Sequence, residues 1–292
     1  QVSNSFGSPA LWDTVTHFCL QHGVKLPSLK RVLLAGAPVP GPLLARFDQI
    51  LSPEARVFTP YGATEALPVS NIEKREILDV TWARTEQGAG TCVGRPVPGL
   101  RVHILPLSDA PIDAWDPGQD LPPGGRGEIA VEAPWVTRDY FQMEKTTRAA
   151  KVLKEGGFLH RMGDVGYFDG QGRLWFCGRK NHRVLTPDGP LFTIPCEAVF
   201  NRHPAVQRTA LVGVGPPGSQ KPVLIVELRM PGPSKKKRMA LEDEILALGK
   251  DHPHTRNIQC VLFHAAFPVD VRHNAKISRE VLARWAEKQC AL

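Results

Sequence analysis

The pattern of apolar and polar residues changes character along the chain, and its first 60 residues read as alternating strands and helices. A short continuous apolar run at 32–35 is typical of a buried parallel strand. Pro42 then opens a stretch with helical spacing, and a second strand is expected at 57–59. The order strand, turn, helix, strand, turn places both turns at one edge of a sheet, where α/β proteins bind ligands.

The later parts of the chain follow two other patterns. Short apolar segments separated by Gly/Pro-rich turns fill 90–178 and predict a small β-barrel or meander. Between 182 and 292, alternating apolar residues, a continuous apolar run at 223–226 and helical spacing at 241–248 predict a compact α+β unit. Ser278 is expected to cap a last helix. We therefore predict a multidomain chain with α/β and α+β parts.

Composition and charge exclude several classes of protein. The 292 residues are 42% hydrophobic and 22% charged, which suits a chain with a sizeable core. Nothing approaches 18 consecutive apolar residues, so we expect no membrane span. The net charge is +7, but its one dense basic run, 235–238, is expected to be a solvated loop. Because no aromatic residues interleave with that run, we expect no nucleic-acid partner.

Cysteine usage and the chain start add two expectations. Six cysteines without regular spacing indicate reduced thiols and a cytoplasmic protein, and the ten histidines show no zinc-ligand spacing. The chain begins with Gln1, and its first methionine is Met143. We therefore expect a piece of a longer protein.

The most informative string is the pentapeptide at 61–65. The ring of Tyr61 can stack on a purine, and Gly62 lets the backbone approach a ligand closely. The hydroxyl of Thr64 can donate to a phosphate, and the carboxylate of Glu65 can hold Mg²⁺. The same string also reads as an ordinary turn into a helix that Thr64 caps.

A second acidic position lies in the Gly-flanked stretch at 161–166. Asp164 held in such a turn can accept both hydroxyls of a ribose diol, although a turn aspartate with no ligand is equally common. The pair Gly178-Arg179 follows, and Asn274-Ala275-Lys276-Ile277 lies near the C-terminus.

Taken in order, these motifs resemble the adenylate-forming superfamily of acyl-CoA synthetases, peptide-synthetase adenylation domains and luciferases. The resemblance covers nearly the whole chain and implies the C-terminal part of a large AMP-binding domain at 1–178, with an α/β layer at 1–89 and a β-barrel at 90–178. A small mobile α+β lid domain is implied at 179–292, with Asn181 as its hinge. ATP and Mg²⁺ are the implied cofactors.

The resemblance also implies a role for individual residues. Gly36, Ala37 and Pro38 would line the adenine pocket, and Tyr61 with Gly62 would meet the base. Thr64 would contact phosphate, and Glu65 the metal. Asp164 and Arg179 would hold the ribose. Lys276 would reach the carboxylate and α-phosphate oxygens, where charge develops in the transition state and a placed cation has its largest effect.

Departures from the family pattern fall beside the charged positions. Asn181 stands where Asp or Lys is usual, Met162 replaces a threonine, and Ala275 replaces a glycine. A phosphate-binding loop ending in Pro-Lys-Gly does not occur in the sequence. We therefore expect that the chain by itself does not adenylate efficiently.

Within the superfamily, the chain resembles the β-lactone synthetases of bacterial olefin biosynthesis in the local sequence of four segments, 6–11, 59–68, 174–180 and 268–276. This branch implies closure of a 2-alkyl-3-hydroxy fatty acid to a β-lactone, with release of AMP and pyrophosphate. Its implied partners are a fatty-acid-type substrate and other olefin-biosynthesis enzymes. Two alternatives stay open: a long-chain acyl-CoA synthetase or acyl-AMP ligase, and a non-catalytic nucleotide-binding module. The two prolines at 187 and 190 speak mildly against a CoA tunnel.

Overall fold

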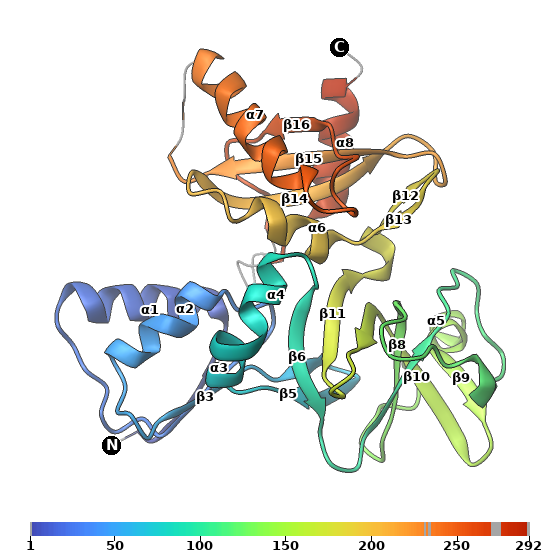
Figure 1. Cartoon of the computed structure of the whole chain (residues 1–292). Coiled ribbons are helices and arrows are strands. Elements are labelled where there is room, and N and C mark those ends of the chain that lie inside the picture. The colour runs from blue at the N-terminus through green and yellow to red at the C-terminus, as the bar shows by residue number, and fades with distance from the viewer. Residues whose placement is uncertain (1, 231, 233–234, 270–275, 291–292) are drawn as a thin grey trace. The chain divides into compact units, whose positions relative to one another are not determined.

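The computed structural model describes residues 2–230, 232, 235–269 and 276–290. The chain divides into two compact units (Figure 1). Unit 1 comprises residues 1–82 and 91–176, and unit 2 comprises residues 83–90 and 177–292.

A three-stranded parallel sheet, in the order β1-β2-β3, forms the first layer of unit 1. Its strands and the helices beside them are β1 (Asn4–Gly7), α1 (Pro9–Gln21), β2 (Arg31–Leu34), α2 (Gly41–Arg46), a 3₁₀ turn (Phe47–Gln49) and β3 (Arg56–Phe58). Val32, Leu34 and Val57 are fully buried, and the ring of Trp12 lies 5.1 Å from that of Phe47. The predicted strand–helix–strand order is therefore present, with the helix interrupted after Arg46.

An eight-stranded sheet forms the rest of unit 1, in the order β4-β5-β6-β11-β10-β8-β7 with β9 paired to β10. Its strands are β4 (Tyr61–Ala63), β5 (Ala66–Asn71), β6 (Thr91–Pro96), β7 (Arg101–Leu105), β8 (Gly127–Glu132), β9 (Lys151–Lys154), β10 (Gly157–Phe168) and β11 (Leu174–Arg179). The sheet begins at Tyr61, well before residue 90, where the sequence pattern changes. The chain at 61–63 is thus a strand and not a turn.

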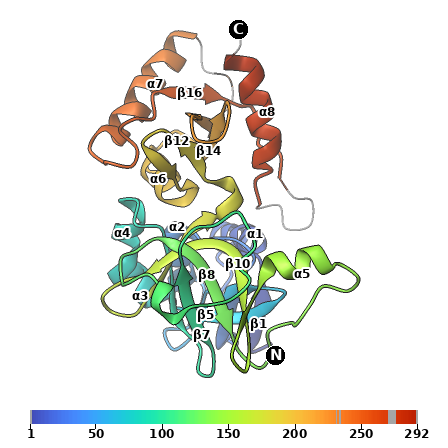
Figure 2. The ribbon, with the colours of Figure 1, turned by 90° about the vertical axis from the view of Figure 1, so that its right-hand side faces the viewer.

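Short helical segments join these strands. They are α3 (Lys74–Glu76), a π-helical turn (Ile77–Thr81), α4 (Trp82–Glu86), a 3₁₀ turn (Pro117–Gln119) and α5 (Glu144–Ala150). Of these, α5 lies directly before β9 and beside β10 (Figure 2).

Unit 2 is built around the three-stranded sheet β14-β15-β16, in which β14 pairs antiparallel and β16 parallel to β15. Its elements are a 3₁₀ turn (Lys180–His182), β12 (Val184–Thr186), β13 (Gly189–Leu191), α6 (Thr193–Phe200), β14 (Val206–Val214), β15 (Lys221–Leu228), α7 (Lys235–Lys250), β16 (Cys260–Phe263) and α8 (Arg279–Cys290). Leu211 packs with α6 and α7, whereas Val212 packs with α8. The alternation in the sequence therefore separates two apolar cores, one on each face of the sheet.

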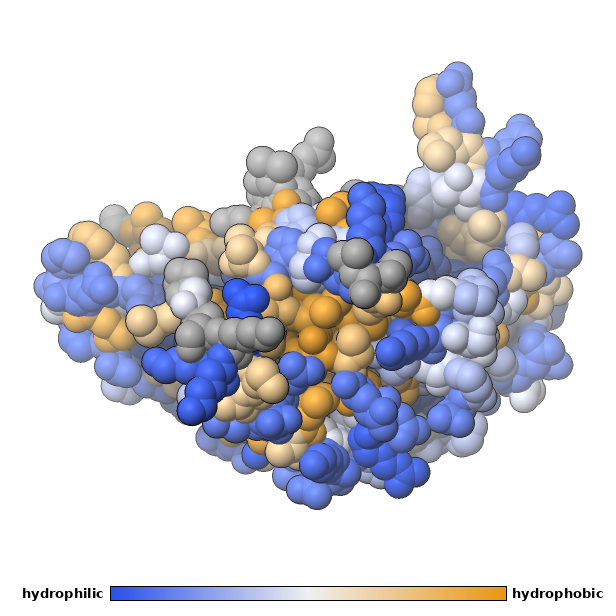
Figure 3. Space-filling model, turned by 90° about the horizontal axis from the view of Figure 1, so that it is seen from above, coloured by the Kyte–Doolittle hydropathy of each residue, from blue (hydrophilic) through white to orange (hydrophobic). Residues whose placement is uncertain are grey.

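The basic run at 235–238 corrects one expectation, because it forms the first turn of α7 and not a loop. Lysine and arginine are good helix formers, and the run continues directly into Met239, Ala240 and Leu241. Lys236 to Arg238 are exposed. Seen from above, hydrophilic residues cover much of the surface and hydrophobic ones gather near its centre (Figure 3). Among the described residues, no helix has the length and apolar character needed to cross a membrane.

Candidate active site

Two of the residues proposed for nucleotide binding meet directly in unit 1. The hydroxyl of Tyr61, on β4, donates a hydrogen bond of 2.6 Å to Oδ2 of Asp164, on β10. The Tyr61 ring also lies 5.8 Å from that of Phe176, tilted by 40°. Residues 103 positions apart in sequence are thus joined, and the Asp164 carboxylate is held in one orientation beside an aromatic face.

A bulge in β10 gives Asp164 its position. The pairing of β10 with β8 shifts register between Arg161 and Val165, and Gly163 there has a φ of +65°. Arg161 fixes one side of this irregularity, because its guanidinium forms a buried ion pair of 2.7 Å with Glu128. The turn that the sequence predicts around Asp164 is therefore a strand bulge, and the Asp164 side chain is 5% exposed.

Thr64 and Glu65 form the two-residue connection of a β-hairpin. Ala63 pairs with Ala66 across this turn, in the antiparallel pairing of β4 with β5. Gly62 matters to the hairpin itself, since a Cβ there would lie 2.5 Å from the Ala66 carbonyl oxygen. The alternative of a helix capped by Thr64 is not realised. The turn instead projects an exposed hydroxyl and a half-buried carboxylate side by side.

The segment 137–140 holds Glu65 at two points. The backbone N–H of Thr137 donates to the Glu65 carbonyl oxygen at 3.0 Å. The Tyr140 hydroxyl donates to Glu65 Oε1 at 2.8 Å. Partial burial alone would raise the pKa of Glu65, but the Tyr140 hydrogen bond and the nearby positive charge of Lys151 hold that pKa below its ordinary value. Glu65 is therefore anionic at neutral pH.

Lys151 and His160 form a buried pair beside this carboxylate. Lys151 Nζ lies 3.1 Å from His160 Nδ1 and also donates to the Thr137 carbonyl oxygen. Burial lowers the pKa of Lys151 to about 8, against the opposing effect of Glu65 and Asp139. Burial and the Lys151 charge together lower the pKa of His160 to about 4. At neutral pH the histidine is thus neutral, and its Nδ1 accepts a hydrogen bond from the Lys151 ammonium group.

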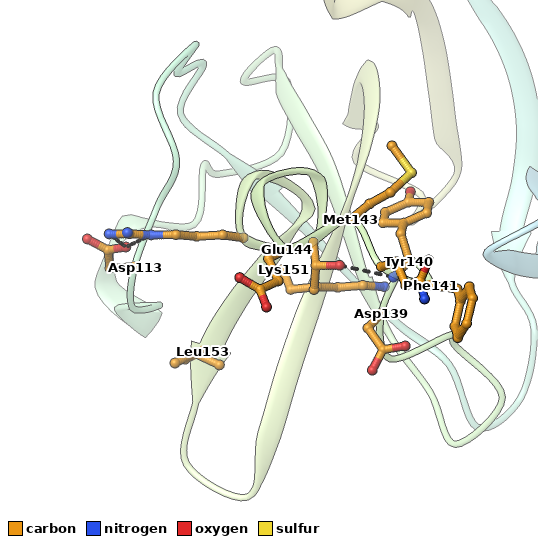
Figure 4. A pocket seen from close by; sticks show the side chains of 11 residues that line it. Asp113, Asp139, Tyr140, Phe141, Met143, Glu144, Lys151 and Leu153 are labelled. Atoms are coloured by element: carbon orange, nitrogen blue, oxygen red, sulfur yellow. Dashed lines mark hydrogen bonds and ion pairs between the residues drawn. The ribbon is translucent and has the colours of Figure 1, made fainter.

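A cavity of about 680 Å³ adjoins this pair. It is lined by the segment before α5, by α5 and by β9, and Figure 4 shows the side chains of Tyr140 and Lys151 approaching each other while Asp113 and Leu153 lie farther off. None of the residues proposed to bind the nucleotide lines it. Tyr140 and Lys151, which line the cavity, connect it to Glu65.

Gly36, Ala37 and Pro38 follow the end of β2, as the sequence predicts. Gly36 has a φ of +97°, a conformation that glycine adopts without strain. Because β2 and β3 are parallel, with Leu33 opposite Phe58, these residues and the start of β4 lie at the same sheet edge. A role for them in adenine binding stays a prediction.

The residues proposed from unit 2 occupy its beginning and its last loop. Arg179 is exposed at the end of β11, and exposed Asn181 lies in the 3₁₀ turn that follows. Residues 184–191, with their two prolines, form the β12–β13 hairpin. Lys276 is exposed, whereas Asn274 and Ala275 lie outside the described residues.

The segment directly after Lys276 is firmly attached to unit 2. Ile277 pairs with Val269, and the Ser278 N–H donates to the Pro268 carbonyl oxygen at 2.9 Å. Arg279, the first residue of α8, forms two hydrogen bonds of 2.5 and 2.9 Å to the buried carboxylate of Glu197. The chain directly after Lys276 is therefore held in place within unit 2.

A family model described as "AMP-binding enzyme" matches residues 1–141. The olefin beta-lactone synthetase of Xanthomonas campestris pv. campestris is 50% identical over 99% of this chain and 52% of its own length. The chain belongs to the adenylate-forming family. The fold and family expected from the motifs are thereby confirmed.

Other adenylate-forming relatives are more distant. A long-chain-fatty-acid–CoA ligase of Thermus thermophilus is 25% identical over 85% of this chain and 43% of its own length. The structure of the amide bond synthetase McbA from Marinactinospora thermotolerans matches with a TM-score of 0.75 and 25% identity, over 98% of this chain and 52% of McbA. The chain thus spans about half the length of the curated relatives that it matches.

Sequence reasoning missed the residues that surround Glu65 in this adenylate-forming chain: Tyr140, Lys151 and His160. Each lies 75 or more residues from Glu65, in segments without a recognisable motif. One signal was available, since Lys151 interrupts the short apolar run formed by 149–150 and 152–153. That signal does not reveal which carboxylate the lysine approaches.

Proposed function

We propose that the intact protein uses ATP to activate a fatty carboxylic acid as acyl-AMP, and that it then closes a 2-alkyl-3-hydroxy fatty acid to a β-lactone. The observation that supports this proposal best is the 50% identity to an olefin beta-lactone synthetase, which extends over 99% of the chain. The joined pair of Tyr61 and Asp164 supports the nucleotide part of it. AMP, pyrophosphate and a cis-β-lactone are the proposed products.

Each residue then has a task that follows from its chemistry. Tyr61 stacks on adenine, and Gly36, Ala37 and Pro38 surround the base. Gly62 lets the hairpin backbone approach the base closely. Asp164 accepts hydrogen bonds from the ribose hydroxyls, and Arg179 helps to hold the ribose. The Tyr61 hydroxyl keeps that carboxylate oriented, so little rotamer freedom is lost when the nucleotide binds.

Thr64 donates to phosphate and Glu65 holds Mg²⁺, while Lys276 neutralises charge on the carboxylate and α-phosphate oxygens. The residues present fit a metal carried by the nucleotide, because the Glu65 carboxylate is anionic. A single carboxylate shared with substrate phosphates is a common arrangement for Mg²⁺. When bound, Mg²⁺ supplies neutralisation of phosphate charge.

Two steps balance the reaction. A carboxylate oxygen of the acid attacks the α-phosphorus of ATP, and pyrophosphate leaves. The 3-hydroxyl oxygen of the same molecule then attacks the acyl carbon, the hydroxyl proton is released, and AMP departs. Because the hydroxyl is tethered beside its target, its effective concentration reaches roughly 10⁵ M when it is well oriented, which offsets ring strain. Asn181 is proposed as the hinge about which unit 2 moves between steps.

The deciding experiment uses the intact protein with ATP, Mg²⁺ and a synthetic 2-alkyl-3-hydroxy fatty acid, without CoA. NMR identifies the organic product, and AMP is quantified in parallel. A β-lactone formed in equal amount to AMP supports the proposal. Acyl-AMP that accumulates until CoA converts it to a thioester would instead establish the acyl-CoA ligase activity carried by the more distant Thermus relative. Absence of pyrophosphate release would indicate a non-catalytic nucleotide-binding module.

A further inference from the structure

Glu65 sits at the tip of a two-residue hairpin turn, a position that does not by itself fix a side chain with three rotatable bonds. Yet its carbonyl oxygen and its carboxylate are both held by one distant segment, through Thr137 N–H and the Tyr140 hydroxyl. A phenol that donates to a carboxylate forms a short and directional hydrogen bond, and the one here measures 2.8 Å.

The segment that grips Glu65 is anchored in turn. The Tyr140 backbone N–H donates to Thr147 Oγ1, on α5, at 3.0 Å. Lys151 holds the Thr137 carbonyl oxygen and lies 4.9 Å above the Phe158 ring. Tyr140 is therefore fixed at its backbone by α5 and at its hydroxyl by Glu65, with a buried cation beneath the segment.

This arrangement matters for a small, hard cation. Mg²⁺ demands near-octahedral geometry, so a ligand that samples several rotamers binds it less well than a ligand held in place. Groups that orient a metal ligand contribute strongly to affinity, and their removal costs about 10–100-fold.

We propose that Tyr140 is a positioning residue, which holds the Glu65 carboxylate in the rotamer that receives the metal of the metal–ATP complex. Thr147 on α5 secures Tyr140 in that position. The inference rests on the proposed function, in which Glu65 contacts the metal. It adds α5 and the segment before it to the machinery of the nucleotide site.

The test measures metal binding directly, without catalysis. Mn²⁺ replaces Mg²⁺, α,β-methylene-ATP replaces ATP, and electron paramagnetic resonance counts bound Mn²⁺ on the intact protein. Tyr140→Phe should weaken Mn²⁺ binding by about 10-fold or more, while the affinity for the metal-free nucleotide stays unchanged. Tyr167→Phe is the matched control, because it also removes one phenol oxygen from unit 1, at a ring that stacks 6.1 Å from Trp175. That control should bind Mn²⁺ as the unaltered protein does.

A double-mutant cycle identifies the route of the effect. If Tyr140 acts through Glu65, then adding Tyr140→Phe to Glu65→Gln should cause no further loss. Losses that simply multiply, or a Tyr140→Phe protein that matches the Tyr167→Phe control, would overturn the inference. Unchanged Mn²⁺ binding in Glu65→Gln alone would refute the metal role of Glu65 in the proposed function, a separate result.

A second variant covers the case in which Tyr140→Phe does not fold. Thr147→Val keeps the side-chain shape and removes the oxygen that accepts from Tyr140 N–H. It should weaken Mn²⁺ binding in the same direction by about 3-fold, the equivalent of one ordinary hydrogen bond. No change in this variant, with Glu65→Gln impaired, would also count against the positioning role.

Discussion

Glu65 is proposed to hold the metal of the metal–ATP complex and Lys276 to reach the α-phosphate, and the chain holds these two charged residues in different ways. Glu65 is gripped by a segment 75 residues away and neighbours a buried lysine–histidine pair. Lys276 is exposed, and the chain that follows it is tied down through Ile277, Ser278 and Arg279.

The difference shows how two tasks place different demands on a fold. A metal ligand benefits from a fixed rotamer, because the geometry of the cation is strict. A lysine that must reach negative charge as it develops during a reaction needs a fixed backbone and a side chain that can move. Residue chemistry alone, carboxylate or ammonium, does not determine how a side chain is supported.

The largest effect is expected from removing the ion pair that holds the chain after Lys276 in place. Arg279→Ala leaves the buried Glu197 carboxylate without its bidentate partner, which typically costs about 3–5 kcal/mol. Amide hydrogen exchange in α6 and β14 of the intact protein should therefore accelerate strongly. Exposed Arg284, on the same helix, gives the control, and Arg284→Ala should exchange as the unaltered protein does. Equal exchange in both variants would show that the pair does not support unit 2.

Removing the Lys276 side chain should slow adenylation and leave the fold intact. Lys276→Ala is expected to slow adenylation by about 10²–10³-fold, the usual effect of losing one transition-state charge partner. Pyrophosphate exchange by the intact protein measures this rate. Because Lys276 is exposed, stability should change by less than about 0.5 kcal/mol. Lys288→Ala, on α8, serves as the control, and a comparable rate loss there would assign the effect to general charge.

A smaller effect is expected in the turn between β10 and β11, which supports the strand of Asp164. Burial alone would raise the pKa of Asp169, but hydrogen bonds from Trp175, Arg173 and Gln171 lower that pKa well below its ordinary value. Asp169 therefore stabilises the fold above its unfolded pKa of about 4, and this contribution is lost as pH falls through the folded pKa. Asp169→Asn should cost about 1.5–3 kcal/mol at pH 7.

Urea unfolding of unit 1, followed by tryptophan fluorescence over a range of pH, measures that cost. The difference between Asp169→Asn and the unaltered protein should shrink as pH drops below about 4. A difference that is constant across the acid range would mean that the Asp169 charge is not what stabilises the turn.

The smallest effect concerns the nucleotide itself. Tyr61→Phe keeps the ring for stacking and removes the hydroxyl that donates to Asp164. The cost is that of one hydrogen bond, about 0.5–1.5 kcal/mol, so the dissociation constant for ATP should rise by about 2–10-fold. Calorimetry on the intact protein measures it. A much larger loss would mean that the hydroxyl also contacts the nucleotide.

Much of the fold was predictable, because its signals are local. Apolar runs located β2, β3 and β15, helical spacing located α7, and Ser278 preceded α8 as expected. The basic run at 235–238 was misread because charge was weighed and helix propensity was not. The hairpin at Thr64 and Glu65 was missed because neither residue is typical of a two-residue turn, which favours Gly, Asn or Asp.

The candidate site likewise divides into residues that local motifs predict and contacts that depend on long-range pairing. Tyr61, Glu65 and Asp164 were named from motifs, but the Tyr61–Asp164 hydrogen bond joins two strands that nothing in the sequence pairs. Tyr140 was invisible, because its importance arises only from the path of 137–140 past the hairpin. Local chemistry can thus be read from residue types, whereas the support of that chemistry depends on long-range pairing.

The position of Phe141 has a practical consequence. Its ring is 86% exposed and follows directly after the residue whose hydroxyl touches Glu65. An indole placed there would sense the surroundings of Glu65, where the metal–nucleotide complex is proposed to bind, while leaving Tyr140 and Glu65 in place. The segment before α5 is therefore a natural location for an optical reporter, through which arrival and departure of the metal–nucleotide complex would be followed in real time.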